Sequence, residues 1–113
     1  MSYQHINLYI KMEIKTTNNF EKILKKLNKN QVIGIENAIR QIAENPGIGE
    51  SKIGDLNNIK VFKFKINSQL YLLSYMICND KIILLLSVGS HQNFYEDLKR
   101  LLKSIKSSNF LNI

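Results

Sequence analysis

A histidine and a tyrosine four residues apart are the side chains best suited to acid–base chemistry in this sequence. Histidine has an unperturbed pKa of about 6.5, so His91 can take up or release a proton near neutral pH. Tyr95 follows it at the start of a predicted helix, where a spacing of four places both residues on the same side. The alternative interpretation is a surface-loop histidine beside a half-buried tyrosine. The sequence leaves both interpretations open.

Lysines near a predicted strand are the candidates for binding an anion. Within residues 61–66, Lys63 and Lys65 alternate with apolar residues, so the strand period of two puts both on one face. Lys60 precedes them, and Lys52 in the preceding loop could reach the same surface. Ammonium groups stabilise the charge that develops on a reacting phosphate. The alternative is a solvated lysine face that protects an exposed sheet.

The charge balance agrees with an anionic partner. The chain has 113 residues, with 16 Lys and Arg against 9 Asp and Glu, which leaves a net charge of +7. So large a surplus on one small domain indicates a polyanionic or acidic partner, although a surface that is only soluble has a similar composition.

Several classes of protein are excluded. The single cysteine, Cys78, cannot build a disulfide framework or a thiolate zinc site, and His5 lies too far from His91 for metal-ligand spacing. We therefore expect no metal and no cofactor. The apolar runs are too short to span a membrane, residues 1–11 do not have the pattern of a signal peptide, and no glycine-rich nucleotide fingerprint occurs. The expected location is the cytoplasm.

Two helices are predicted in the first half of the chain. Asn18 and Glu21 form a candidate capping box, and a helical apolar face follows it. The second helix ends at Asn45-Pro46, because proline cannot continue a helix. The apolar residues of the two helices are Phe20, Ile23, Leu24 and Leu27, and then Val32, Ile35, Ala38, Ile39 and Ile42.

Three strands over residues 61–66, 69–77 and 81–88 are predicted to form a meander, because only short turns connect them. The glycine-containing stretch 46–58 reads as a loop. Gly89 and the polar residues after it are expected to end the last strand. A basic helix then starts near Phe94.

A short strand at residues 12–15 precedes these elements. The order is strand, helix, helix, three strands and helix, and this order predicts an α+β fold. We expect an N-terminal extension at 1–11, one domain at 12–106 and a frayed tail at 107–113.

The segment from Leu86 to Arg100, LSVGSHQNFYEDLKR, resembles the junction between the last strand and the last helix in the RelE/ParE superfamily of bacterial type II toxin–antitoxin toxins. Many members have a glycine, a small hydroxyl residue, a histidine and an aromatic residue there. Asn45-Pro46 and Gly54-Asp55-Leu56 also match. The resemblance runs from about residue 12 to about residue 103. It implies an N-terminal strand, a two-helix hairpin, a three-stranded antiparallel meander and a C-terminal helix.

The resemblance implies a ribosome-dependent mRNA endoribonuclease, in which a ribose 2′-hydroxyl attacks the neighbouring phosphate without a metal ion. Carried over to this chain, His91 is the acid or base, and Tyr95 stacks on a base or orients the phosphate. Lys63 and Lys65 steady the transition state. The further residues expected to bind RNA are Lys52, Lys60, Lys99 and Arg100.

Two alternatives stay open. Residues 61–88 contain no arginine, whereas cleaving members usually carry one on the sheet, and lysine cannot make the same fork to a phosphate. The superfamily also includes toxins that inhibit DNA gyrase by protein contact, and the third possibility is a module that only binds its antitoxin. All three predict an acidic, partly disordered antitoxin as partner, besides the ribosome and mRNA or, alternatively, gyrase.

Overall fold

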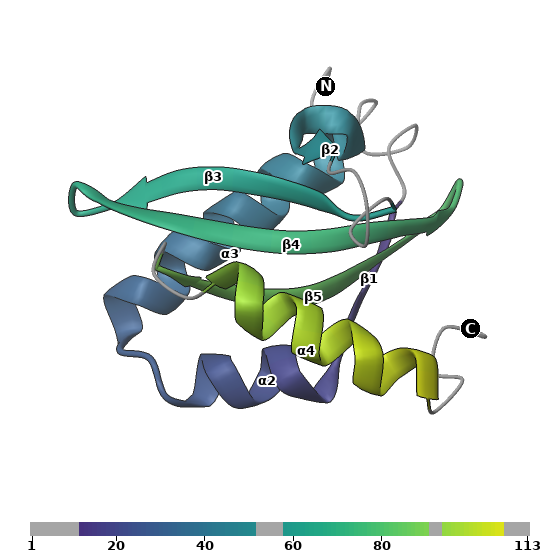
Figure 1. Ribbon diagram of the computed structural model, residues 1–113. Coiled ribbons are helices and arrows are strands. Elements are labelled where there is room, and N and C mark those ends of the chain that lie inside the picture. The colour runs from purple at the N-terminus through teal and green to yellow at the C-terminus, as the bar shows by residue number, and fades with distance from the viewer. Residues whose placement is uncertain (1–11, 52–57, 91–93, 108–113) are drawn as a thin grey trace, which may run out of the picture.

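The computed structural model describes residues 12–51, 58–90 and 94–107. The predicted α+β order is confirmed (Figure 1). In chain order the elements are β1 (Glu13–Thr16), α2 (Asn18–Lys25), α3 (Lys29–Glu44), the 3₁₀ helix η1 (Pro46–Ile48), β2 (Glu50–Ser51), β3 (Lys60–Ile66), β4 (Gln69–Asn79), β5 (Ile82–Ser90) and α4 (Phe94–Ser107). No helix in the described ranges is long and apolar enough to cross a membrane.

The five strands form one sheet in the order β1-β5-β4-β3-β2. β3, β4 and β5 are the predicted antiparallel meander, and β1 runs parallel to the first half of β5. The expectation of a plain loop at 46–58 is wrong in its first part, because η1 and β2 lie there and β2 pairs with β3. The buried Tyr75 phenol holds the η1 segment against the sheet, because it donates to the Pro46 carbonyl (2.6 Å) and accepts from the Gly49 amide (2.9 Å). Lys52, which is predicted to bind RNA, and the Gly54-Asp55-Leu56 match to the superfamily lie outside the described residues.

The turns and ends of the strands follow local chemistry. Asn67 and Ser68 have φ values of 50° and 70°, as a two-residue hairpin turn that matches the strand twist requires. The expectation that Gly89 ends the last strand is wrong. β5 continues to Ser90, because β4 is long enough to pair with both residues, at Leu72 and Tyr71.

The helices begin at side-chain caps. The predicted Asn18–Glu21 box is wrong, because the N-cap of α2 is Thr17, whose hydroxyl accepts from the Phe20 amide (3.0 Å). Glu21 instead accepts from the Thr16 hydroxyl (2.7 Å). α3 has a complete capping box made by Asn28 and Gln31, and it ends at Glu44, before the proline as predicted.

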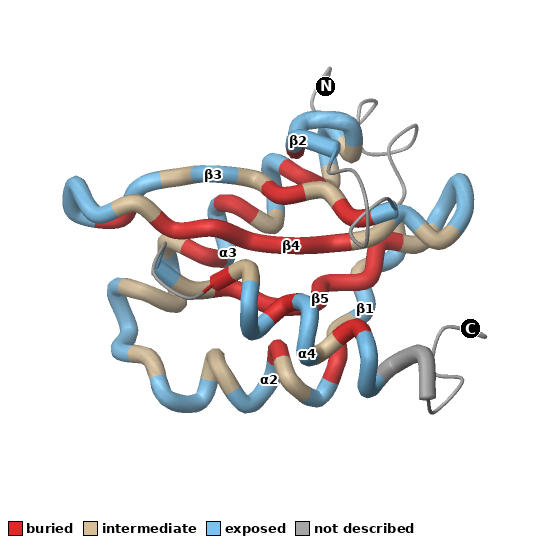
Figure 2. The backbone as a smooth tube through the Cα atoms, viewed as in Figure 1, coloured by how far each residue is buried: buried red, intermediate tan, exposed pale blue. Residues whose placement is uncertain are grey.

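The sheet separates two apolar clusters, and its central strands are buried on both faces (Figure 2). The first cluster joins the sheet to α2 and α3. The second lies under α4, on the opposite face, and consists of Ile59, Val61, Leu72, Leu84, Leu86, Phe94, Leu98 and Leu102. Tyr71 and Tyr75 are buried in the first cluster, whereas Phe62 and Phe64 are half-buried against it. α4 is thereby fixed on the face of the sheet opposite to α2 and α3.

Candidate functional site

The two β3 lysines share the face of the sheet on which α4 packs. Lys63 is the cross-strand partner of Leu72, which belongs to the cluster under α4, and Leu72 in turn pairs with Gly89 of β5. Lys65 follows two residues later, opposite Leu70, so it lies on the same face. Both lysine residues are exposed. Since strands lie about 4.8 Å apart, the Cα of Lys63 is roughly 10 Å from the Cα of Gly89.

Tyr95 lies in the first turn of α4 and packs against the same cluster. It is half-buried, and its ring meets the ring of Phe94 edge-on, with 5.2 Å between centroids and 87° between planes. Because Leu72 links this cluster to Lys63 across the strands, the fold brings Tyr95 and the two lysines to one face. His91 lies outside the described residues, between Ser90 and Phe94.

The other described residues that are predicted to bind RNA do not all lie on this face. Lys60 pairs across the strands with Tyr75 and, three residues before Lys63, lies on the opposite face, where it donates to the Ser51 hydroxyl (2.9 Å). Lys99 is exposed and follows Tyr95 by four residues, so it shares the side of α4 that carries Tyr95. Arg100 turns away from that side and pairs with Asp97 (Nη1–Oδ1 3.1 Å).

Sequence reasoning missed the carboxylate on β2. The Nζ of Lys63 lies 3.7 Å from Oε1 of Glu50, and these side chains are 47% and 63% exposed. Nothing in the sequence around Glu50 indicates a strand, because only two residues pair with β3. The carboxylate opposes the charge of Lys63, whereas Lys65 has no ion-pair partner among the residues that the structure describes.

Comparison with known proteins identifies the family. Residues 14–99 match the family model described as the ParE-like toxin of the type II bacterial toxin–antitoxin system. The chain belongs to this family of toxins. A search of curated protein sequences finds no match.

Solved structures of E. coli RelE have the same fold as this toxin. The free-state structure of a RelE mutant is 18% identical, with a TM-score of 0.65, and the alignment covers 84% of this chain and 98% of that one. RelE in the intact RelBE toxin–antitoxin complex is 21% identical, with a TM-score of 0.58 and coverage of 72% and 98%. The P21 form of isolated RelE is also 21% identical, with a TM-score of 0.57 and coverage of 80% and 98%.

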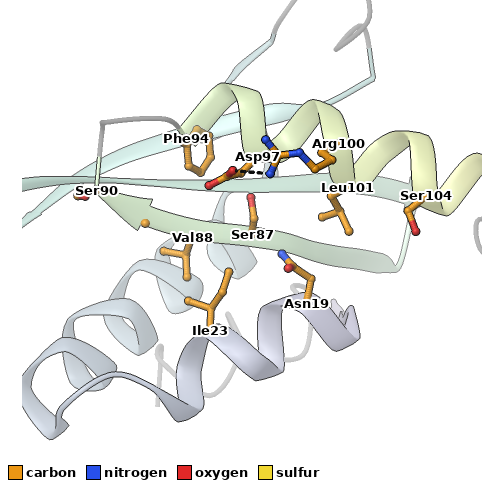
Figure 3. A pocket seen from close by; sticks show the side chains of 11 residues that line it. Asn19, Ile23, Ser87, Val88, Ser90, Phe94, Asp97, Arg100, Leu101 and Ser104 are labelled. Carbon is orange, nitrogen blue, oxygen red and sulfur yellow. Dashed lines mark hydrogen bonds and ion pairs between the residues drawn. The ribbon is translucent and has the colours of Figure 1, made fainter.

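A groove of about 540 Å³ runs along the toxin between α2, α4 and the end of β5 (Figure 3). Its lining combines apolar side chains with an ion pair and hydroxyl groups: Asn19, Ile23, Ser87, Val88, Gly89, Ser90, Phe94, Asp97, Arg100, Leu101 and Ser104. A second hollow of about 300 Å³, between the sheet and α2 and α3, shares Ile23 and residues 88–90 with it. The groove opens on the side of α4 away from Tyr95.

Among the described residues, two titratable groups have a shifted pKa. Burial raises the pKa of the Tyr75 phenol, although the Gly49 amide opposes that shift. Burial also raises the pKa of Cys78, which packs against the cluster under α4, so this thiol holds its proton more firmly than a free cysteine does. In the described ranges no three histidine, cysteine, aspartate or glutamate side chains gather as metal ligands.

Proposed function

We propose that this toxin cuts ribosome-bound mRNA in the cytoplasm. The observation that supports the proposal is that Lys63 and Lys65 lie on the face of the sheet against which Tyr95 and the rest of α4 pack. Two exposed ammonium groups and a partly exposed aromatic ring on one face can bind an RNA phosphate and stack on a base. The net charge of +7 favours binding to the polyanionic ribosome.

The proposed reaction is a transesterification. The ribose 2′-oxygen attacks the adjacent phosphorus and forms a new P–O bond, while the bond from phosphorus to the 5′-oxygen of the next nucleotide breaks. One proton leaves the 2′-hydroxyl and one is delivered to the departing 5′-oxygen. His91 is proposed as the acid or base, and Tyr95 as the residue that stacks on a base or orients the phosphate. Lys63 and Lys65 stabilise the charge on the phosphate oxygens.

Contacts to RNA beyond the reacting phosphate are proposed for the other basic residues. Lys99 extends the Tyr95 side of α4, and Lys60 lies on the other face of β3. Lys52 and Arg100 complete the proposed set. A separate antitoxin is the expected inhibitor, because this chain is a type II toxin and its fold matches RelE in a toxin–antitoxin complex.

Mapping of mRNA ends after brief induction tests the proposal. Cells that express the toxin should accumulate new mRNA ends within translated regions. His91→Ala should lose these ends and relieve growth arrest, whereas His5→Ala should keep both. Purified His91→Ala should unfold at the same denaturant concentration as the parent protein, so that a folding defect is excluded. Growth arrest with intact mRNA would reject the proposal.

The sequence of the sheet favours a second candidate, inhibition of DNA gyrase by direct contact. No arginine occurs between Lys60 and Ser90, so the sheet offers no guanidinium fork for a phosphate. In that case gyrase-linked DNA breaks should accumulate after induction while mRNA remains intact. The two measurements, made on the same culture, separate the candidates.

A further inference from the structure

The hollow between the sheet, α2 and α3 carries polar side chains that the proposed cleavage does not use. Its volume is about 300 Å³, at the lower end of the range for ligand pockets. Apolar side chains of both helices and of β5 form its walls, and its polar groups belong to Gln31, Gln69, Tyr71 and Ser90. A small, flat molecule with a polar edge suits this lining.

The hydroxyl group of Tyr71 has a proton to offer to a ligand in the hollow. The backbone N–H of Asn28 donates to Oε1 of Gln31 (2.9 Å), and this capping-box contact fixes which end of the Gln31 carboxamide is the oxygen. Nε2 of Gln31 donates to the Tyr71 hydroxyl (2.8 Å), so the hydroxyl oxygen is the acceptor there. Tyr71 is 6% exposed, and its own proton has no acceptor among the residues that the structure describes.

Gln31 supplies a second donor beside the first. A carboxamide nitrogen carries two protons, and Tyr71 accepts only one of them. The hollow therefore presents two neighbouring donors, and its described lining residues include no carboxylate. A ligand with two neighbouring acceptors complements this pair. A ligand group that itself donates would leave a buried donor unpaired, which is costly.

Unpaired nucleobases differ in this feature. Guanine has neighbouring acceptors at O6 and N7, and cytosine has them at O2 and N3. In adenine the amino group lies beside N1 and N7, and in uracil a ring N–H separates the two carbonyl oxygens. Sequence-specific recognition of RNA mostly targets unpaired bases, whose edges are read by hydrogen bonds. The two donors of the hollow therefore favour guanine and cytosine.

The hollow lies at the end of the sheet that carries Lys65. Lys65 pairs across the strands with Leu70, and the next residue of β4, Tyr71, pairs with Ser90 at the end of β5. Tyr71 belongs to the cluster under α2 and α3, so the hollow and Lys65 lie on opposite faces of this end. β1 stops pairing at Leu85, and no described strand lies beside β5 beyond that point. RNA bound at Lys65 can therefore reach the hollow round the end of β5.

We propose that the hollow binds one unpaired guanine or cytosine of the RNA, and that Tyr71 and Gln31 select it. The Tyr71 hydroxyl and the Gln31 amide donate to the two acceptors at the edge of the base, and the apolar walls enclose the faces of its ring. The inference rests on the RNA substrate of the proposed function, and it adds a preference for particular bases.

Two substitutions change the hollow, and a third is their control. Tyr71→Phe keeps the ring and removes the hydroxyl group. Leu27 is half-buried and lines the hollow, so Leu27→Trp fills it with an indole ring. Leu101→Trp is the matched control, because Leu101 is also half-buried but lines the neighbouring groove and not the hollow. Denaturant unfolding establishes that each variant is folded.

The experiment measures binding of the full chain to labelled oligonucleotides of 2′-O-methyl uridine by fluorescence anisotropy. One central position is guanosine, cytidine, adenosine or uridine, and the 2′-O-methyl groups prevent cleavage, so only binding is measured. We expect the guanosine and cytidine oligonucleotides to bind at least about fivefold more tightly than the other two. Replacing guanosine with 7-deazaguanosine, which lacks the N7 acceptor, should weaken binding about three- to tenfold.

The variants should change this preference in different ways. Tyr71→Phe removes one of the two donors and should lower the preference for guanosine over adenosine by about three- to tenfold. Leu27→Trp should abolish the preference, and Leu101→Trp should retain it. The comparison of guanosine with 7-deazaguanosine uses the parent protein, so it tests the inference even if a variant does not fold.

Three results would overturn the inference. They are the absence of binding at about 1 mM protein, equal affinity for all four oligonucleotides, or an undiminished preference in folded Tyr71→Phe or Leu27→Trp. The proposed cleavage is tested separately by mRNA ends. Base-selective binding with intact mRNA would reject only the cleavage proposal, whereas new mRNA ends without base-selective binding would reject only this inference.

Discussion

The two β3 lysines should contribute unequally to RNA binding. Lys63 lies 3.7 Å from the carboxylate of Glu50, whereas Lys65 has no ion pair within the described part of the chain. A phosphate that binds Lys63 must compete with that carboxylate. We therefore expect Lys65→Ala to weaken binding of single-stranded RNA more than Lys63→Ala does.

The magnitude follows from counterion release. Each phosphate contact on a single strand contributes about 0.7 to the slope of log affinity against log salt concentration, so one contact accounts for about a 2.6-fold loss of affinity over a fourfold rise in salt. Lys65→Ala should lower the slope by about 0.7, and the double variant should lower it by at most about 1.4. Lys63→Ala should lower the slope by less than Lys65→Ala does, because the Glu50 carboxylate already screens the ammonium group of Lys63.

The assay is fluorescence anisotropy of a labelled single-stranded RNA oligonucleotide over a series of salt concentrations. Lys25→Ala is the control, because Lys25 is an exposed lysine of α2 that lies on neither the lysine face nor the groove. A double variant with the slope of the parent protein would refute the assignment of RNA binding to this face. Equal effects of the two single variants would refute the competition with Glu50.

Three further changes test the packing and the charge of the site. Leu98→Ala removes a fully buried side chain under α4 and should destabilise the protein by about 2–5 kcal/mol in denaturant unfolding. A Cβ at Gly34 would lie 2.7 Å from Cγ1 of Ile66, so Gly34→Ala should destabilise by about 1 kcal/mol although alanine favours the helix. Glu50→Gln frees Lys63 and should tighten RNA binding about two- to threefold in the anisotropy assay.

Matched controls accompany these changes. Leu101→Ala, at a half-buried position, should cost less stability than Leu98→Ala, and equal unfolding midpoints for Leu98→Ala and the parent would contradict the placement of α4. Gly47→Ala should be nearly neutral, since its Cβ would come no closer than 3.9 Å to another group. Glu44→Gln removes an exposed carboxylate on α3. If it tightened RNA binding as much as Glu50→Gln does, net charge alone would explain the effect of Glu50→Gln.

Local patterns predicted the parts of the fold that local chemistry determines. The alternation around Phe62 and Phe64 gave the correct faces of β3, and Pro46 gave the end of α3. The N-cap of α2, Thr17, was not predicted. Its hydroxyl also donates to the Leu86 carbonyl, 69 residues away, and a local sequence pattern does not show such a contact. The pairing of β1 with β5 and the two-residue β2 likewise depend on contacts distant in sequence.

The same distinction applies to the site. The period of a strand was enough to place Lys63 and Lys65 together, and it also puts Lys60 on the other face. The proximity of Glu50 to Lys63 was not predictable, since it arises from pairing across a loop. The point at which β1 stops pairing with β5, at Leu85, was not predictable either, because it is determined in the folded sheet.

A toeprint assay on translating ribosomes, with purified toxin added, tests the central claim most directly. The account predicts new mRNA ends within the open reading frame for the parent protein, their persistence with Lys25→Ala, and their loss when Lys63 and Lys65 are both replaced by alanine. Full-length mRNA with the parent protein, or undiminished cleavage by the double variant, would contradict it.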